Sequence, residues 1–386
     1  MLVHGPYPIG EPRVAREAAA ALAEGFEVEV VATRRSGEPA EVTTEGVRVV
    51  RLPLSRRRGA GFASTVLEYV AFTLMASVVA TRRHLRSRYD VVHVHNPPDF
   101  LIAAALVPKL LGTRVILDVH DLSSHMFGAR FSAGRAAPIA RGLLRRIQLV
   151  ASRLADAVVT VHQPYKDELA AQGVDPRKVT IVMNAVDDRL LPNQSNRPQD
   201  EHLRIVYHGT LTPIYGLDLL VKAVAKLRDR GLAFTVELYG EGDAAEEIRR
   251  SVAGAGLGDR FHITPSYLPQ AEVLARVVGA SVGVIPNLPS ELSEFALSSK
   301  LFEYVALKIP VVSADLPTIR AHFSADEIAF FRAGDAGSLA DVLAADAADP
   351  DGARARAERA LRRYEDYRWP VQSARYVTLL RTLLAD

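Results

Sequence analysis

The sequence predicts an α/β fold made of two doubly wound domains, each with a largely parallel sheet covered by helices. Short β-branched segments alternate with longer segments of helical spacing, which is typical of βαβ units. The chain has 386 residues, which exceeds one ordinary domain of about 100–200 residues. A polar stretch, residues 187–202, interrupts the alternation and predicts an interdomain linker.

The first predicted domain covers residues 1–186. Its expected strands are Leu2–His4, Val28–Ala32, Val91–His95, Arg114–Leu117 and Ala157–Val161. Residues 13–22 and 100–111 have the apolar spacing of helices. The apolar run 69–80 is shorter than the roughly 20 residues of a membrane span, so we expect a buried helix there.

The second predicted domain covers residues 203–368. Its expected strands are Arg204–His208, Thr235–Tyr239, Phe261–Thr264, Ser281–Ile285 and Val311–Ala314. Residues 216–227 carry apolar side chains at helical spacing, which predicts a helix after the first of these strands. Residues 369–386 are expected to form a final helix, with Pro370 in its first turn.

Composition narrows the class of protein. The hydrophobic fraction is 48% and the charged fraction 24%, as in globular domains. The chain has no cysteine, which excludes a disulfide scaffold, a thiolate metal site and a cysteine nucleophile, and fits a reducing compartment. The first ten residues lack the basic and apolar regions of a secretory signal. We therefore expect a cytoplasmic protein, resting in one interpretation on the inner face of the cytoplasmic membrane.

Charge is distributed unevenly along the chain. Residues 1–190 hold 25 Lys and Arg against 19 Asp and Glu, whereas the remainder holds 22 against 26. Many of the basic residues in the first part form three clusters: Arg56, Arg57 and Arg58; Arg82, Arg83, Arg86 and Arg88; and Arg141, Arg145 and Arg146. A solvated surface and a patch for anionic lipid or a polyanionic substrate both fit these clusters. Nucleic acid is disfavoured, because the net charge is only +2 and aromatic residues do not alternate with the arginines.

Glycines follow two of the strands predicted in the second domain. Gly209 and Gly216 flank a loop between a strand and a helix, and Gly240 follows the next strand. Glycines let a phosphate approach the backbone, and a helix N-terminus attracts it. Ordinary strand-to-helix turns explain the same spacing, so both interpretations stay open.

A short predicted helix that begins near residue 298 carries the most specific pattern. Ser298 or Ser299 would cap it. Lys300 in its first turn is unfavourable unless an anion such as a diphosphate balances it. Glu303 shares a face with Lys300 and would accept two ribose hydroxyls. The alternative is a surface salt pair.

Two histidines follow strands of the first domain. His95 ends one strand, and His120 follows the next, beside Asp118 and Asp121. This grouping suggests an acid–base pair or a metal site. Because no second set of His or Glu stands at ligand spacing, we predict no metal.

Seven stretches resemble, in the expected order, the retaining nucleotide-sugar-dependent glycosyltransferases of family 4, which have the GT-B architecture. They are residues 8–21, 90–101, 115–122, 182–187, 207–223, 238–243 and 298–315. The resemblance covers most of the chain and implies two Rossmann-like domains that face each other across a cleft, with the final helix crossing back to the first domain. The set is specific for the fold and superfamily and not for a substrate.

The resemblance implies a nucleoside diphosphate sugar in the second domain and a hydroxyl acceptor mostly in the first. Glu303 matches the glutamate that binds the ribose, and His120 the histidine beside the transferred sugar. Gly209 and Gly216 match the phosphate loop. Enzymes of this kind typically need no metal, so no cofactor is expected.

The sequence departs from the family pattern at several positions. The first glutamate of the Glu-x7-Glu motif falls on Phe295, next to Glu294. The usual phosphate-binding Arg and Lys fall on Thr210 and Tyr215. Lys300 is then the best remaining cation for the diphosphate.

Other site residues follow from the same comparison. We expect Arg13 to reach across a closed cleft as a second cation, and Gly10 to represent the family's Gly-Gly loop. His95 and Asp121 are assigned to the acceptor side. The remaining donor contacts are Ser266 and Tyr267 for the base and Ala296, Leu297, Ser298 and Ser299 for the sugar and phosphates.

The sequence therefore predicts a retaining glycosyltransferase in polysaccharide, glycolipid or natural-product biosynthesis. A lipid-linked acceptor fits the Arg-rich first half. The uncharged Thr210, Tyr215 and Phe295 keep a non-catalytic GT-B partner subunit open as the alternative. A nucleotide-sugar epimerase or a phosphorylase is a weaker alternative.

Overall fold

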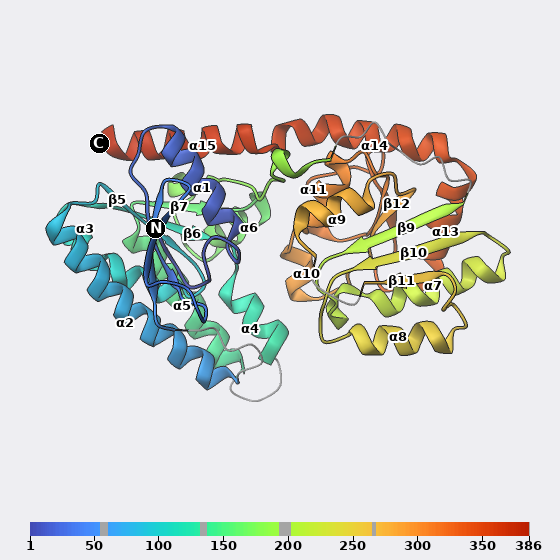
Figure 1. Ribbon diagram of the computed structural model, residues 1–386, viewed down its shortest axis with the longest axis horizontal. Helices are drawn as coiled ribbons and strands as arrows, with labels where there is room; N and C mark the ends of the chain where they lie inside the picture. The colour runs from blue at the N-terminus through green and yellow to red at the C-terminus, as the bar shows by residue number, and fades with distance from the viewer. Residues whose placement is uncertain (55–60, 132–136, 193–201, 265–267, 386) are drawn as a thin grey trace. The chain divides into compact units, whose positions relative to one another are not determined.

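The computed structural model describes residues 1–54, 61–131, 137–192, 202–264 and 268–385. It divides into two compact units (Figure 1). One consists of Met1–Asn184 with Pro370–Asp386, and the other of Ala185–Trp369. Both units are α/β, which confirms the predicted fold class.

The N-terminal unit is built on an eight-stranded sheet in the order β3-β4-β2-β1-β5-β6-β7-β8. The strands are β1 Leu2–Val3, β2 Glu29–Thr33, β3 Glu41–Thr44, β4 Val47–Leu52, β5 Val91–His95, β6 Arg114–Val119, β7 Ala157–Thr160 and β8 Val179–Ile181. All pairs are parallel except β3 with β4. Glu45 and Gly46, both with positive φ, form the turn of this hairpin, which sequence analysis did not predict.

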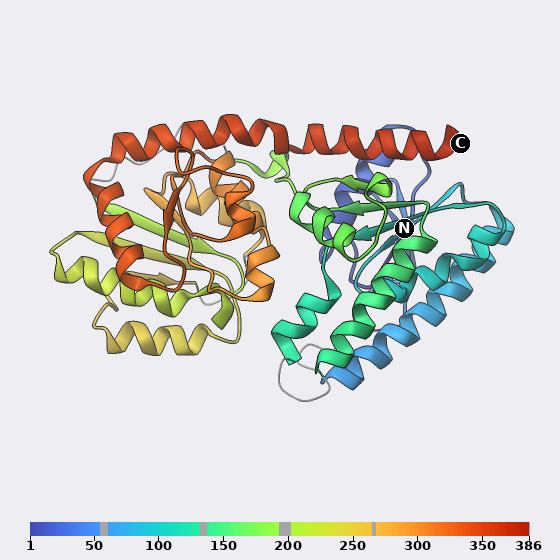
Figure 2. The same cartoon turned by 180° about the vertical axis from the view of Figure 1, so that it is seen from behind.

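Helices cover both faces of this sheet. They are α1 Pro12–Ala23, α2 Phe62–Arg86, η1 Asp99–Ala105, α3 Leu106–Leu110, α4 Ser123–Phe131, α5 Ala137–Leu154, α6 Gln163–Ala171, η2 Pro176–Lys178 and α15 Trp369–Ala385. Figures 1 and 2 show α1 and α15 on one face and α2 and α5 on the other. The C-terminal helix α15 packs on this unit, where the Gln372 side chain accepts a hydrogen bond from the Met183 N–H (3.0 Å).

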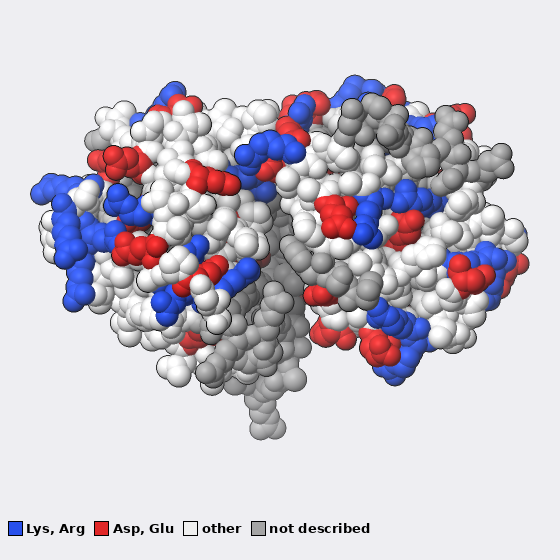
Figure 3. All heavy atoms as spheres, viewed as in Figure 1, with Lys and Arg blue, Asp and Glu red and all other residues white. Residues whose placement is uncertain are grey.

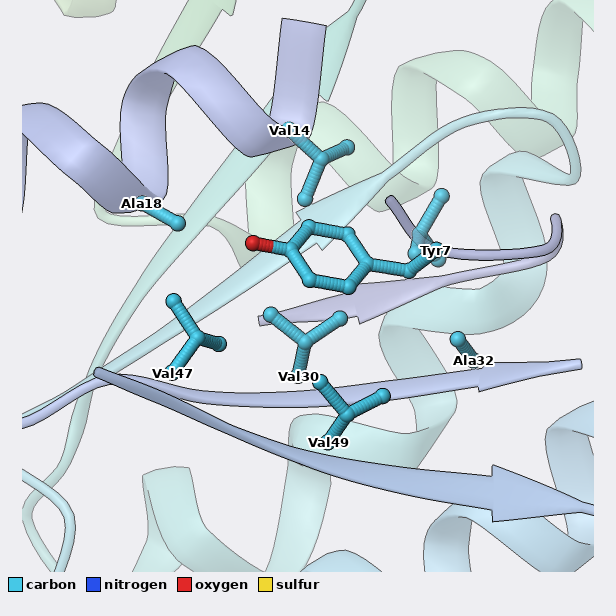
Figure 4. Close-up of a cluster of buried hydrophobic side chains, with 8 residues drawn as sticks. Tyr7, Val14, Ala18, Val30, Ala32, Val47 and Val49 are labelled. Atoms are coloured by element: carbon cyan, nitrogen blue, oxygen red, sulfur yellow. The ribbon is translucent and has the colours of Figure 1, made fainter. Parts of the chain in front are cut away.

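The core beneath α1 joins that helix to the sheet (Figure 4). Val14 and Ala18 of α1 meet Val30 of β2 and Val49 of β4, and the Tyr7 ring lies between the helix and the strands. Each of these side chains is buried. Burial of a valine side chain contributes about 1.5–3 kcal/mol, so this cluster fixes α1, and with it the polar residues on the helix, against the sheet.

The C-terminal unit has a six-stranded, fully parallel sheet in the order β11-β10-β9-β12-β13-β14. The strands are β9 Leu203–His208, β10 Phe234–Tyr239, β11 Phe261–Ile263, β12 Val282–Ile285, β13 Val311–Ala314 and β14 Ala329–Phe331. The helices are η3 Asp188–Leu190, η4 Pro213–Tyr215, α7 Leu217–Asp229, α8 Ala245–Gly254, α9 Gln270–Val277, α10 Glu291–Phe295, α11 Ser299–Ala306, α12 Pro317–Arg320, α13 Ala336–Ala348, α14 Pro350–Tyr364 and η5 Glu365–Tyr367. Because the sheet is parallel, the loops after β9 and β10 meet at one edge.

Helix α2 corrects the sequence prediction of a buried helix. It has 25 residues, and one face, with Phe72 and Ala76, is buried while Leu67 and Leu74 on the other face are exposed. Residues 63–86 form a helix long and apolar enough to cross a membrane by length and composition. In the sequence the apolar run was bounded by Glu68 and by Arg82 and Arg83, whereas the helix continues beyond them in both directions.

Three of the predicted features lie wholly or largely outside the described residues. They are the base-binding residues Ser266 and Tyr267, the arginine cluster Arg56–Arg58, and residues 193–201 of the linker.

Candidate active site

In the C-terminal unit, the glycine turns after β9 and β10 pack against each other and against Lys300. Gly209 has φ +114°, and a Cβ at this position would lie 2.5 Å from Cε of Lys300. A Cβ on Gly240 would lie 1.9 Å from the carbonyl oxygen of Gly209. Both positions therefore require glycine, and their close approach gives the Lys300 side chain its place above the end of β9.

Lys300 is a buried cation that forms no ion pair with the residues that the structure describes. Its residue is 8% exposed, and its ammonium lies 4.5 and 5.2 Å from the ring centroids of Tyr215 and Tyr207. Burial lowers the pKa of Lys300 to about 8, against the opposing influence of Glu303. Among the described residues, none places a carboxylate oxygen within 4.0 Å of its Nζ. A desolvated ammonium of this kind is suited to bind an anionic group.

The tyrosine rings explain how the site retains a lysine without a counter-ion. A cation over an aromatic face gains about 0.5–2 kcal/mol, which offsets part of the desolvation cost. Tyr215 occupies the position where the resemblance expected a lysine, and here it orients Lys300 through its ring. Thr210 is exposed, and its carbonyl accepts a hydrogen bond from the Tyr207 hydroxyl (2.9 Å).

Glu303 is held by two side chains that sequence analysis gave no role. Gln270 of α9 donates to Oε1 of Glu303 (2.7 Å), and Nε2 of His208 lies 3.0 Å from Oε2. Burial, reinforced by Lys300, lowers the pKa of His208 to about 3, so its ring is neutral. His208 ends β9 and was visible as a strand-end residue, whereas Gln270 carried no sequence signal.

The segment before α11 contains the other predicted donor contacts. Glu294 and Phe295 end α10, Ala296 and Leu297 connect the two helices, and Ser298 and Ser299 begin α11. Ser298 stands at the N-cap, but its side chain makes no capping hydrogen bond, contrary to the prediction. The first-turn N–H groups of α11 are therefore not taken by that hydroxyl. Gly216 adopts the left-handed conformation (φ +66°) immediately before α7.

In the N-terminal unit, Arg13 corrects the prediction of a cation that reaches the diphosphate. Its Nε and Nη2 donate to Asp118 at 2.6 and 3.0 Å, and Nη1 donates to the Val182 carbonyl (2.8 Å) and to Asn184 (3.1 Å). Its side chain is 7% exposed. Burial alone would raise the pKa of Asp118, but Arg13 together with His120 and His95 outweighs burial and holds that pKa well below its usual range. The arginine neutralises a buried carboxylate inside its own unit.

Two of the histidines beside Asp118 have different environments. His95 is fully buried, with Nδ1 3.1 Å from Oδ2 of Asp118, and burial lowers its pKa to about 4. This position does not fit the predicted contact of His95 with an acceptor. His120 has a side chain that is 15% exposed, with Nδ1 3.7 Å from the same oxygen. Burial opposes the charged form of His120, but Asp118 outweighs burial and raises the pKa of the imidazole.

Asn96 positions the turn that carries His120, and sequence analysis missed it. Its Oδ1 accepts hydrogen bonds from the N–H groups of His120 (3.0 Å) and Asp121 (3.2 Å), and its Nδ2 donates to the Asp121 carbonyl (2.6 Å). An Asn at the end of β5, next to β6 in a parallel sheet, was the available signal. Gly10 lies on an exposed part of the loop before α1 and donates its N–H to the Pro6 carbonyl (2.7 Å).

The fold also assembles a group of metal-ligand types that the sequence did not reveal. Atoms of Glu17, His93, His95 and Asp118 lie within 4.8 Å of one another, and all four residues are buried. Arg13 bonds both oxygens of Asp118 and lies 3.3 Å from Glu17. Because the guanidinium already supplies positive charge here, we interpret the group as an ion-pair cluster.

Glu17 makes the stability of this cluster depend on pH. Burial raises the pKa of Glu17 to about 8, although Arg13 opposes the shift. The folded state binds the Glu17 proton more tightly than the unfolded state does, and this stabilises the fold. The stabilisation is complete below about pH 4.5 and is lost as pH rises through about 8. In Glu17→Gln, we therefore expect the free energy of unfolding, measured by urea titration, to fall less than in wild type between about pH 5 and about pH 8.

Glu27→Gln is the control for this experiment, because Glu27 is exposed in the loop just after α1. It should keep the wild-type pH profile. An equal fall in Glu17→Gln and wild type would contradict a protonated, buried Glu17.

Comparisons with known proteins agree with this architecture. Residues 10–185 match the family described as "Glycosyl transferase 4-like domain", and residues 202–348 match "Glycosyl transferases group 1". The chain is 28% identical over 270 residues to 2-deoxystreptamine glucosyltransferase of Streptomyces kanamyceticus, covering 66% of this chain and 68% of the relative.

Two solved structures share the fold. The sucrose-phosphate synthase of Thermosynechococcus elongatus has a TM-score of 0.76 at 19% identity, covering 96% of this chain and 92% of that one. The Anabaena protein HepE in complex with UDP-glucose has a TM-score of 0.70 at 13% identity, covering 99% and 98%. The chain is therefore a glycosyltransferase of the GT-B type.

Proposed function

We propose that this glycosyltransferase transfers a sugar from a nucleoside diphosphate sugar to a hydroxyl acceptor with retention of the anomeric configuration. The observation that carries the proposal is the buried Lys300 ammonium beside the Gly209 turn and the start of α11. A diphosphate would supply the missing negative charge, and Glu303, oriented by Gln270, would accept ribose hydroxyls. In the absence of the usual charged residues at positions 210 and 215, Lys300 would carry most of the cationic stabilisation.

The proposed reaction breaks the bond between the anomeric carbon and the β-phosphate oxygen, and the diphosphate leaves with the electron pair. The acceptor oxygen bonds to the same face of the sugar, and its proton passes to the leaving phosphate. Lys300 and the N–H groups at the start of α11 would stabilise the departing charge. His120, whose raised pKa favours the charged ring, would donate a hydrogen bond to the sugar.

The proposal includes no metal and no other cofactor, because Lys300 and backbone donors would balance the diphosphate. We also propose a cytoplasmic location, which fits the lack of cysteine. The acceptor would be a growing polysaccharide, a lipid-linked glycan or a small natural product.

Binding of nucleoside diphosphates tests the proposal first. UDP leads the panel because the fold is shared with a protein whose structure contains UDP-glucose. Thermal unfolding would be followed with UDP, GDP, ADP, CDP and dTDP in the presence of a chelator. A ligand at about 100 times its Kd adds about 2.7 kcal/mol to the free energy of unfolding, which raises Tm by several degrees. We expect one base to stand out.

Turnover then separates the candidate functions. The sugar nucleotide of the selected base would be incubated with the enzyme and acceptors, and the product anomer read by NMR. Retained configuration supports the proposal, and inverted configuration contradicts it. Binding without consumption of the donor, over a broad panel of acceptors, would favour a non-catalytic partner subunit. An absence of any shift would contradict the nucleotide site.

A further inference from the structure

The exposed large apolar side chains of the protein gather on α2, α3 and α5 and at the end of α3. In the part of the chain that the structure describes, only Ile9, Val371 and Leu384 lie elsewhere. A scattered set of exposed apolar residues is normal, but a concentrated set marks an interaction surface.

One stripe runs along α2. Leu67, Val70, Leu74, Val78 and Leu85 are all at least 40% exposed. Their spacing of three, four, four and seven residues places them on one face of the helix. At 1.5 Å per residue, the stripe is about 27 Å long. It therefore forms a continuous apolar surface along most of α2.

A second stripe runs along α5. Ile139, Leu143 and Val150 are 76%, 57% and 55% exposed. Helices α2 and α5 both pack on η1 and lie on the same face of the sheet (Figures 1 and 2). Leu110, at the end of α3, is 84% exposed. The three helices thus present their apolar residues from one side of the N-terminal unit.

The charges on these three helices are almost all positive. Arg82 and Arg86 stand exposed at the end of α2, and Arg146 and Arg153 stand exposed on α5. The described residues of α2, α3 and α5 include a single acid, Glu68, whose side chain is 12% exposed and lies 3.0 Å from a buried histidine. In Figure 3, the lower left of the molecule, where α2 runs, is largely white, and basic side chains gather at its left end.

We propose that this apolar and basic side, formed by α2, α3 and α5, docks on the surface of an anionic lipid bilayer. Aliphatic side chains flanked by arginines, on helices whose described residues include no exposed acid, match the requirements of an interfacial helix. The hot spots of protein interfaces are instead poor in leucine and valine, and the α2 stripe consists of these two residue types alone. The lipid surface is therefore the occupant that the composition favours.

Helix α2 would lie in the interface and would not cross the bilayer. Phe72 and Ala76 on its inner face are buried in the unit. Arg83 bonds Glu29 of β2 (2.9 Å), and His84 accepts a hydrogen bond from the Tyr89 N–H (3.2 Å). If α2 crossed a bilayer, these contacts would break, and the apolar core residues that α2 now covers would be exposed.

Vesicle flotation of the full chain tests this inference without donor or acceptor, so the result is independent of the transferase activity. The vesicles would contain phosphatidylcholine alone, or with about one third phosphatidylglycerol, at about 0.1 and about 0.5 M salt. We expect at least about tenfold more bound protein with the anionic lipid, and a clear decrease at the higher salt.

Two variants separate the apolar and basic contributions. Leu67→Ser with Leu74→Ser should lower binding about tenfold or more. Arg82→Ser with Arg86→Ser should lower binding to anionic vesicles and reduce its salt dependence. Leu384→Ser is the matched control, because Leu384 is exposed on α15, at the opposite face of the sheet, and should bind as wild type does.

Three outcomes would overturn the inference. Failure to float with anionic vesicles, or flotation that the Leu67→Ser and Leu74→Ser change leaves intact, would contradict lipid docking. A lipid-free dimer in analytical ultracentrifugation that the same double variant dissociates would show that a second copy covers this side. Circular dichroism would confirm that each variant is folded.

Discussion

Replacing Lys300 by methionine is expected to lower kcat/KM for the sugar nucleotide by about 10²–10³-fold, the usual effect of removing one donor to a developing oxyanion. The lysine is the cation that the structure places beside the Gly209 turn, where its ammonium faces the rings of Tyr207 and Tyr215. The variant should also lose most of the thermal shift that the selected nucleoside diphosphate produces in wild type.

The same substitution should not weaken the fold below pH 8. A protonated lysine whose pKa is lowered to about 8 destabilises the folded state at neutral pH, because the charged form is desolvated. Methionine fills a similar volume without charge. We expect the free energy of unfolding of Lys300→Met to equal or exceed that of wild type at pH 7, as measured by urea titration.

The lowered pKa also predicts how nucleotide binding changes with pH. Below about pH 8 the amine is charged and binds the diphosphate, whereas above it the free enzyme loses this charge. Affinity in wild type should therefore fall as pH rises from about 8 to about 10, and calorimetry in buffers of different ionisation heat should show proton uptake on binding. Lys300→Met should show neither effect.

Lys222→Ala is the control, because Lys222 is an exposed lysine of α7 that pairs with Asp218. It should retain wild-type kcat/KM and its pH dependence. Near-normal turnover in Lys300→Met, with Lys222→Ala equally unaffected, would show that Lys300 does not bind the diphosphate.

The sequence predicted the fold where residue patterns are strong. β5 and β13 have the predicted bounds, because both are largely buried and each begins with two valines. The hairpin β3–β4 was missed because β3 is a half-exposed edge strand with no apolar run. β8 and β14, with three residues each, were also missed, although β1 and β11, which are no longer, were predicted.

In the candidate site, too, local patterns were predicted from the sequence and contacts between distant residues were not. Lys300 and Glu303 stand three residues apart, so their shared helix face was visible in the sequence. The partners of Glu303 and Asp118 come from distant elements, and Arg13 and Asp118 are separated by 105 residues. No local pattern indicates such pairs, since they depend on how α1, β5 and β6 meet. The structure therefore changed the role of Arg13 from a ligand contact to a buried ion pair.

Breaking the ion pair between Arg13 and Asp118 is expected to have the second large effect. Arg13→Met is expected to lower the free energy of unfolding by about 3–5 kcal/mol, the usual cost of removing one partner of a buried pair. The change removes the guanidinium from Asp118, which is fully buried and keeps the weaker contact with His120, and it leaves the Val182 carbonyl and Asn184 without this donor. Urea titration at pH 7 would measure the loss.

Two further measurements identify the uncompensated charge as the cause. The loss in Arg13→Met should be smaller at pH 5 than at pH 7, because without the guanidinium burial raises the pKa of Asp118 and the carboxyl takes up a proton. Adding Asp118→Asn should recover at least about 1 kcal/mol, since that change removes the buried charge. If Arg13→Met is only partly folded in the absence of urea, Tm can replace the urea titration as the measure of stability, both between pH 5 and pH 7 and between the single and the double variant.

Arg177→Met provides the surface comparison, because Arg177 pairs with Asp175 at 2.9 Å but its side chain is 90% exposed. Its loss should stay within about 1 kcal/mol, since solvent screens such pairs. If Arg13→Met lost no more than Arg177→Met, the buried cluster would not depend on the guanidinium charge. The four neighbouring ligand types would then need another source of positive charge, and a bound metal ion would become the better explanation for Glu17, His93, His95 and Asp118.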